Sequence, residues 1–329
     1  QDENRTHVYY GLRVIQKTRR PGLKALMAVA GVDSSKINAR SFGFQLGPRM
    51  NASGRLETAR YSLDLLLASD GMEALDRAQQ LDAMNIERRK EQDRIYKEAL
   101  VQAEKLAKDK VLVVSHVNWS HGIIGIVAAK LLEKYKKPTY VLEDMGEESK
   151  GSARSYGDFS AADAIKASGD IITKGGGHKL AAGVTLPTKN IAKFRDSVNE
   201  FYESLNLKNQ LEKLLPKADV TIADLSEVTE ELVGKLAQLE PFGNGNPEPV
   251  LQLNEVLVTN VRRMGADNQH VKIQVQDANS KRIELLAFNA DKSWFIEPGE
   301  RVNIWFEPNI NEWNGNRSVE GRLLHLTVI

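Results

Sequence analysis

The segment from Gly71 to Lys110 contains no proline and no glycine after its first residue, and its apolar residues recur at helical spacing. Because proline and glycine commonly end helices, this segment predicts one long helix or two nearly continuous helices. The run Glu87–Glu91 is charged at every position, and we expect it to form a solvated face. A long, highly charged helix of this kind is typical of a connection between domains.

The pattern changes at Lys110. Residues 110–115 are a short apolar, β-branched run, which is typical of a buried strand. A helical pattern at 122–134 and a second apolar run at 138–142 follow, which together predict a βαβ unit with parallel strands. From residue 250 onward, five short runs separated by Gly, Asn and Asp predict a small β-barrel of the OB type.

The predicted fold class is therefore α/β, with a mixed-sheet domain between a helical region and an OB-fold barrel. The four expected parts are a helical region at 1–70, a long connecting helix at 71–108, an α/β domain at 109–215, and an OB-fold domain with its linker at 216–329.

Composition limits the partners and the compartment. The chain has 45 basic and 44 acidic residues, so any binding of nucleic acid must rest on local basic patches. It has no cysteine, which excludes disulfides and thiolate metal sites and fits the reducing cytoplasm, where we expect the protein. No apolar run approaches the roughly 18 residues of a membrane span, and no signal-peptide pattern is present, so we expect no membrane partner.

The run Gly175-Gly176-Gly177-His178 is the first candidate site for an anion. Three glycines remove every Cβ from a turn, so backbone N–H groups can approach an oxyanion. His178 can donate a hydrogen bond or carry charge near neutral pH. This run alone leaves open the alternative of a glycine-rich turn with an ordinary surface histidine.

Residues 47–55 are the second candidate, because Arg49, Asn51, Ser53 and Arg55 place two guanidiniums and two neutral polar groups close together. The planar fork of arginine suits bidentate recognition of phosphate. The alternative is a loop at a helix start with structural salt bridges.

Two further candidates lie at the ends of the predicted strands. Ser120 and His121 fall between a strand and a helix, where α/β sheets bind ligands and helix N-termini attract anions; Ser120 could equally be the helix N-cap. Ser152 and Arg154 share one face of the strand at 151–155, which could equally be an ordinary edge strand. The sequence offers no metal-ligand spacing and no nucleophile motif, so these are groups that bind phosphate without an evident means of cleaving its esters.

Five motifs follow one another along the chain: Gly47–Arg55, Gly122–Gly125, Gly151–Ser155, Gly175–His178 and Pro241–Asn246. Their order resembles that of the RecJ family, the bacterial single-stranded-DNA-specific exonucleases among the DHH phosphoesterases, and this resemblance covers nearly the whole chain. The resemblance implies a DHH-associated, substrate-binding domain at 109–215 and a nucleic-acid-binding OB domain at 216–329.

The chain resembles a RecJ protein without its N-terminal DHH domain, of which residues 1–70 would be a remnant. In this family, Asp and His residues of the DHH domain hold Mn²⁺ or Mg²⁺, so we expect the metal ligands to lie outside this chain. The resemblance implies that the intact protein is a 5′→3′ exonuclease of DNA repair and recombination. Its implied partners are single-stranded DNA with a 5′ end, the DHH domain and other repair proteins, and this chain alone is expected to bind DNA without hydrolysing it.

The resemblance also implies roles for single residues. Arg49 and Arg55 would contact the DNA backbone, and Ser152 and Arg154 would grip the terminal 5′-phosphate. The catalytic candidate is His178, which would lie with the three glycines before it at the nucleotide that is cleaved.

In the OB domain, strand alternation predicts that Lys272 and Trp305 point outward, where the tryptophan could stack on single-stranded bases. Trp305 covered by another element is the alternative. Two other functions remain open: a DHH-family phosphodiesterase of short oligonucleotides or dinucleotides, and a non-enzymatic single-strand-binding module. The first leaves the β-rich part unexplained, and the second leaves the phosphate-binding cluster unexplained.

Overall fold

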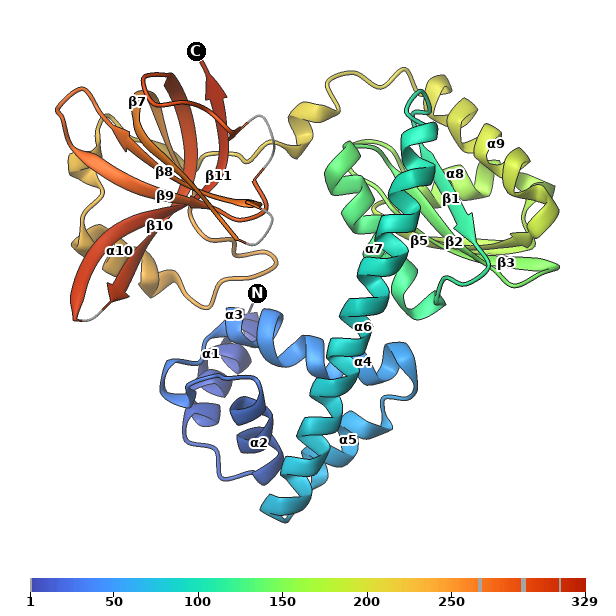
Figure 1. Ribbon diagram of the computed structural model, residues 1–329, viewed down its shortest axis with the longest axis horizontal. Helices are drawn as coiled ribbons and strands as arrows, with labels where there is room; N and C mark the ends of the chain where they lie inside the picture. Colours follow the sequence, from blue (N-terminus) through green and yellow to red (C-terminus); the bar gives the residue numbers. More distant parts are fainter. Residues whose placement is uncertain (1, 266–267, 291–293, 314) are drawn as a thin grey trace. The chain divides into compact units, whose positions relative to one another are not determined.

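The computed structural model describes residues 2–265, 268–290, 294–313 and 315–329, and the chain divides into two compact units (Figure 1). One unit comprises residues 12–214, and the other comprises the chain up to Gly11 together with residues 215–329. The region expected at 1–70 is therefore shared between the units, and its first residue, Gln1, lies outside the described residues. No described helix is long and apolar enough to cross a membrane.

The long helix predicted after residue 70 is a single helix, α6 (Gly71–Lys105). Asp70 caps it by accepting hydrogen bonds from the backbone N–H groups of Met72 and Glu73 at 2.8 and 2.9 Å. The helix packs against α2, α4 and α5 of the N-terminal region and also against the α/β part of the same unit. The helices before it are α1 (Asp2–Gln16), α2 (Pro21–Val29), α3 (Ala39–Ser41), a π-helix (Phe42–Leu46), α4 (Gly47–Leu56) and α5 (Arg60–Leu67).

The α/β part contains a five-stranded sheet in the order β1-β2-β3-β5-β4. The predicted βαβ unit is confirmed, because β1 and β2 are parallel and α7 connects them; the other pairs are antiparallel. The strands are β1 (Leu112–His116), β2 (Thr139–Asp144), β3 (Glu148–Arg154), β4 (Lys174–His178) and β5 (Ala181–Pro187), and the helices are α7 (His121–Tyr135), α8 (Ala161–Ala167) and α9 (Ile191–Ser204).

Helices cover the two faces of this sheet unequally. On one face, Val114 and Val141 pack with apolar residues of α6 and α7, and α7 contacts β2 and β3. On the other face, Tyr140 and Val184 pack with residues of α8 and α9. The α7 side of the sheet ends in small residues, with open space beside Gly176. The sheet therefore keeps one polar, shallow surface next to the start of α7.

The glycine run was predicted to be a loop, and this prediction is wrong: the run forms the edge strand β4, paired with β5. Gly177 has φ +148°, and a Cβ there would lie 2.6 Å from the carbonyl oxygen of Ala181. A Cβ on Gly175 would lie 2.6 Å from Ile165 Cγ2 of α8. Glycine is rare in strands, so the sequence pattern suggested a turn, but here close backbone approach requires it.

The second unit contains the predicted OB barrel. Five strands close through the pairing of β10 with β7, and β11 runs parallel to β9. Val271, Ile273 and Val275 alternate inward along β8 and fill the core. The Arg5 guanidinium of α1 donates to the carbonyl oxygens of Leu239 and Glu240 in the same unit. The elements are β6 (Val220–Thr221), α10 (Glu230–Leu236), β7 (Leu251–Met264), β8 (His270–Gln276), β9 (Arg282–Ala287), β10 (Arg301–Trp313) and β11 (Asn316–Val328).

We predict that Gly177→Ala lowers the free energy of unfolding by about 2 kcal/mol, because the new Cβ meets backbone atoms of β5 and the positive φ strains alanine. For a unit of this size, that corresponds to roughly 4–8 °C in Tm, measurable by calorimetry. Gly43→Ala is the control, since a Cβ there meets nothing within 4 Å. An unchanged Tm for Gly177→Ala would contradict the strand assignment.

Candidate phosphate-binding site

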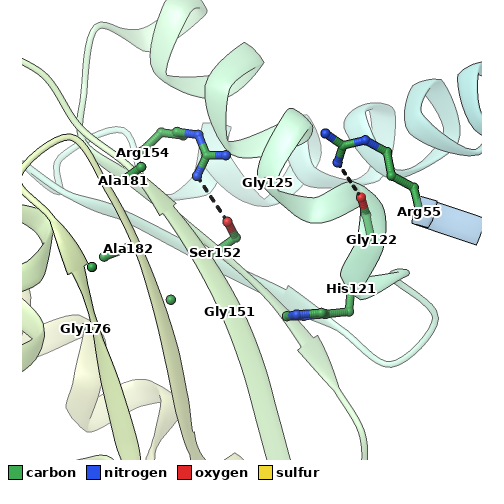
Figure 2. A pocket seen from close by; sticks show the side chains of 12 residues that line it. Arg55, His121, Gly122, Gly125, Gly151, Ser152, Arg154, Gly176, Ala181 and Ala182 are labelled. Carbon is green, nitrogen blue, oxygen red and sulfur yellow. Dashed lines mark hydrogen bonds between the residues drawn. The ribbon is translucent and has the colours of Figure 1, made fainter. Parts of the chain in front are cut away.

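A pocket of about 360 Å³ lies on the exposed side of the sheet, beside the start of α7 (Figure 2). Its polar lining comes from Arg55 at the end of α4, His121 at the start of α7, and Ser152 and Arg154 on β3. Every other lining residue is glycine or alanine. The pocket thus combines a few strong hydrogen-bond donors with a floor that is mostly backbone.

Strand register explains how the floor and the polar side chains come together. Ser152 of β3 is paired with Gly183 of β5, which is paired with Gly176 of β4. Directly paired residues in antiparallel strands point to the same face of a sheet. Ser152 and Arg154 therefore stand beside a surface that carries almost no side chains, and a bulky ligand can approach them from the β4 side.

Two glycines one turn apart allow α7 to lie close to these groups. A Cβ on Gly125 would lie 2.9 Å from Ser152 Oγ and 3.2 Å from an Nη atom of Arg154. A Cβ on Gly122 would lie 2.1 Å from the backbone oxygen of Arg55. Arg55 in turn donates from Nη1 to the carbonyl oxygen of Gly122 at 2.8 Å. The glycine spacing thus fixes α4, α7 and β3 around one pocket.

The electrostatics of the pocket favour an anion. Arg154 Nη1 donates to Ser152 Oγ at 3.2 Å and to the Ala153 carbonyl oxygen at 2.7 Å. Neither Arg154 nor Arg55 forms an ion pair with a carboxylate within the described part of the chain. Burial lowers the pKa of Arg154, and the positive charge of Arg55 lowers it further. Two neighbouring guanidiniums without a counter-charge, beside the positive end of the α7 dipole, can hold a phosphate.

Six of the residues singled out from the sequence line this pocket, and others are used elsewhere. Arg49 forms a salt bridge from Nε to Asp82 of α6 at 2.8 Å and donates to the Gln45 carbonyl oxygen. The predicted contact of Ser53 with a ligand is not supported, because Ser53 is fully buried and hydrogen-bonds within the helical region. The six that line the pocket are Arg55, His121, Ser152, Arg154, Gly176 and Gly177.

The remaining predicted residues lie outside the pocket lining. Asn51 is exposed on α4, and Ser120 precedes α7 as its N-cap without a capping hydrogen bond from its side chain. Gly175 faces α8, on the opposite side of the sheet. His178 is exposed at the end of β4 and shares the face of Arg154 through its pairing with Ala181. Alternation along β4 thus places Gly175 and Gly176 on opposite faces of the sheet, which a loop would not do.

Sequence reasoning missed the small residues that shape the pocket. The run Ala181–Gly183 was assigned no role in binding from the sequence, yet it forms the floor. The spacing of Gly122 and Gly125, on one side of a helix, was the available signal for close packing of α7.

The OB unit holds the other two predicted residues. Trp305 is half-buried on β10, and its ring lies 5.3 Å from that of His325 on β11. Lys272 on β8 forms ion pairs with Glu284 and, at 4.0 Å, with Glu320. The two residues lie on strands that are not neighbours in the barrel.

Comparison with known proteins gives the family. Two family models match, the DHHA1 domain at residues 108–204 and the RecJ OB domain at 219–325. The single-stranded-DNA-specific exonuclease RecJ of Bacillus subtilis is 34% identical over 322 residues, covering 96% of this chain and 40% of that protein. The chain belongs to the RecJ family. The resemblance inferred from the five ordered motifs is thereby confirmed.

Other RecJ proteins agree. RecJ of Escherichia coli is 30% identical over 334 residues, covering 96% of this chain and 56% of that protein. The crystal structure of Thermus thermophilus RecJ in complex with Mg²⁺ matches with a TM-score of 0.83 and 26% identity, covering 98% of this chain and 48% of that chain. The chain thus spans about half the length of the RecJ proteins that it matches.

The residues of this chain do not fit the divalent metal of the RecJ structures. Across the described ranges, no group of three or more His, Asp or Glu residues comes close enough to hold a metal ion. The polar groups of the pocket are cationic or neutral, so they suit an anion and not a cation.

We predict that Gly125→Ala weakens binding of inorganic phosphate about tenfold, because its Cβ displaces Ser152 and Arg154 from their positions. Isothermal titration calorimetry measures the affinity, and Gly43→Ala serves as the control. Phosphate affinity equal to that of the unaltered chain would show that α7 does not set the geometry of the pocket.

Proposed function

We propose that this chain is the substrate-binding part of a 5′→3′ single-stranded-DNA exonuclease and that its pocket holds the 5′-terminal phosphate. The observation that carries this proposal is the pair of guanidiniums, Arg55 and Arg154, which lack a carboxylate partner among the described residues and flank Ser152 over a glycine floor. A terminal phosphate has two charges and three accepting oxygens, which match this set of donors.

The residues of the pocket would have different roles in binding the DNA end. Arg154 and Ser152 are linked by a hydrogen bond and stand on a rigid strand, so they fix the phosphate. Arg55 is exposed and comes from a helix, so it reaches the phosphate from the opposite side. The surface of β5 and β4 carries almost no side chains and leaves room for the first nucleotide. His178, at the end of β4 and outside the pocket lining, would contact the DNA there.

In this proposal, hydrolysis is carried out by the part of the intact protein that this chain does not cover. Two Thermus RecJ structures are described as complexes with Mg²⁺ and Mn²⁺, and a bound divalent ion would activate water and stabilise the leaving oxygen. This chain orients the DNA end for that chemistry. The intact protein would work with its DHH domain and with other repair proteins, in the cytoplasm.

The OB unit would hold the single strand further from its 5′ end. Trp305 offers a half-exposed ring beside the ring of His325, and base stacking on such rings does not depend on sequence. Stacking needs an unpaired base, so this contact favours single-stranded over duplex DNA.

We predict that Arg154→Ala lowers the preference for a 5′-phosphorylated over a 5′-hydroxyl oligonucleotide by at least about tenfold, since it removes a charge-assisted hydrogen bond worth roughly 1.5–3 kcal/mol. Fluorescence anisotropy with end-matched single strands measures the ratio of affinities. Arg195→Ala, on the α9 side of the sheet, makes the same change in net charge and should leave the ratio unchanged.

The same samples also test whether this chain hydrolyses DNA by itself. With Mn²⁺ present, the strand, labelled at its 3′ end, should stay at full length on a denaturing gel. An unaltered chain that binds both oligonucleotides equally would refute the 5′-phosphate assignment, and shortened product would place the hydrolytic site in this chain.

We predict that Trp305→Ala weakens binding of single-stranded DNA about tenfold, within the range expected for one lost base stack. Trp305→Phe keeps an aromatic face and should retain most of the affinity. If the alanine variant bound as tightly as the unaltered chain, the strand would follow a different path over the barrel.

A further inference from the structure

The buried face of α6 has a polar interruption. Along this face, the apolar residues Ala74, Ala78 and Leu81 pack in the helical region, and Ile95, Ala99 and Ala103 pack against α7 and the sheet. Between these two sets the buried residues are Asn85, Arg88 and Gln92. The solvated face expected at Glu87–Glu91 is confirmed for Glu87, Arg89 and Lys90, which are exposed, and is wrong for Arg88, which is only 8% exposed.

Arg88 is buried without a full set of partners. Nη1 donates to Gln92 Oε1 at 2.9 Å, and Nη2 donates to Asn85 Oδ1 at 3.2 Å. Nε is buried and has no hydrogen-bond partner, and no carboxylate forms an ion pair with Arg88 in the described part of the chain. Burying an unpaired charge is costly, so such a group needs an explanation outside the stability of the helix.

The surroundings of Arg88 relate it to the pocket. Burial lowers the pKa of this guanidinium, and the positive charges of Arg89 and Arg55 lower it further. Asp93 is the nearby carboxylate that opposes this effect, but its side chain is 59% exposed and pairs with Lys130 at 3.2 Å. Arg55 stands at the end of α4, which packs against α6, and its neighbour Leu56 packs against the apolar cluster that contains Ile95 of α6. The charge of Arg55 therefore lies near Arg88 on α6 as well as near Arg154 in the pocket.

We propose that Arg88 is a positioning residue of the phosphate site: its buried charge acts through Arg55 and gives the pocket a positive potential that only a bound phosphate compensates. This proposal rests on the proposed function. Asn85 and Gln92 hold the guanidinium in place and are neutral, so they orient the charge without cancelling it.

Burial gives this charge a property that a surface arginine lacks. Salt screens exposed charges strongly and buried ones weakly. A phosphate held by Arg55 and Arg154 alone would lose much of its electrostatic attraction in concentrated salt. With the buried charge of Arg88 added, the preference for a 5′-phosphate should persist when salt has already weakened contacts along the rest of the DNA strand.

The test compares three variants of the full chain. Arg88→Gln removes the charge and can still hydrogen-bond with Asn85 and Gln92, Arg88→Lys keeps the charge and loses the planar fork, and Arg89→Gln changes the charge of an exposed neighbour. The probes are the same single strand with a 5′-phosphate or a 5′-hydroxyl, and the readout is the ratio of their affinities at low salt and at about 0.5 M NaCl.

We expect Arg88→Gln to lower this ratio about tenfold at both salt concentrations, while Arg88→Lys and Arg89→Gln keep it near the value of the unaltered chain. A ratio that is preserved in Arg88→Gln overturns the inference and leaves the proposed function standing. A ratio lost in Arg88→Lys and kept in Arg88→Gln would assign Arg88 to hydrogen bonding within α6 and also overturns it. Absence of any 5′-phosphate preference in the unaltered chain would remove both proposals together.

Discussion

The close approach of Gly122 to the backbone oxygen of Arg55 is the contact on which the site depends. No side chain fits between them, so the start of α7 lies directly against the end of α4. The hydrogen bond from Arg55 to the Gly122 carbonyl oxygen then holds the arginine near the sheet. A cation from the helical region and a cation from β3 thereby share one pocket, although about a hundred residues separate them in the chain.

The site concentrates positive charge in a chain whose overall charge is nearly balanced. Arg49 has Asp82 as a partner, whereas Arg55, Arg88 and Arg154 have no carboxylate partner in the residues that the structure describes. Apolar packing on both sides of Asn85, Arg88 and Gln92 offsets the cost of that arrangement. Unpaired positive charge is therefore concentrated at and near the pocket, where the proposed function needs it, whereas Arg49 of the helical region is used for structure.

Regular elements were predictable from the sequence because their patterns are strong. The spacing of apolar residues predicts the βαβ unit, and helical spacing without proline or glycine predicts the long helix. Short runs separated by turn residues predict the barrel. The errors come from long-range contacts. Gly175–Gly177 were predicted to form a loop because the close contacts that require glycine there are made with a partner strand, β5, which a local pattern does not reveal. Arg88 was predicted to be solvated because its burial depends on helices that are distant in sequence. Ser152 and Arg154, which strand alternation and the family motif together singled out, line the pocket, and their contact with a phosphate stays a prediction.

The strand β4 combines an exposed sheet edge with a sequence that is poor at pairing. An unpaired edge is a template for association with other extended chains, and proteins often protect such edges with bulky or charged side chains. Large side chains on this strand would close the pocket, so the protection here must come from its three glycines, which disfavour strand pairing, and from Lys174 and Lys179 at its ends. The residues that keep the site open therefore also make this exposed edge a poor template for association with other strands.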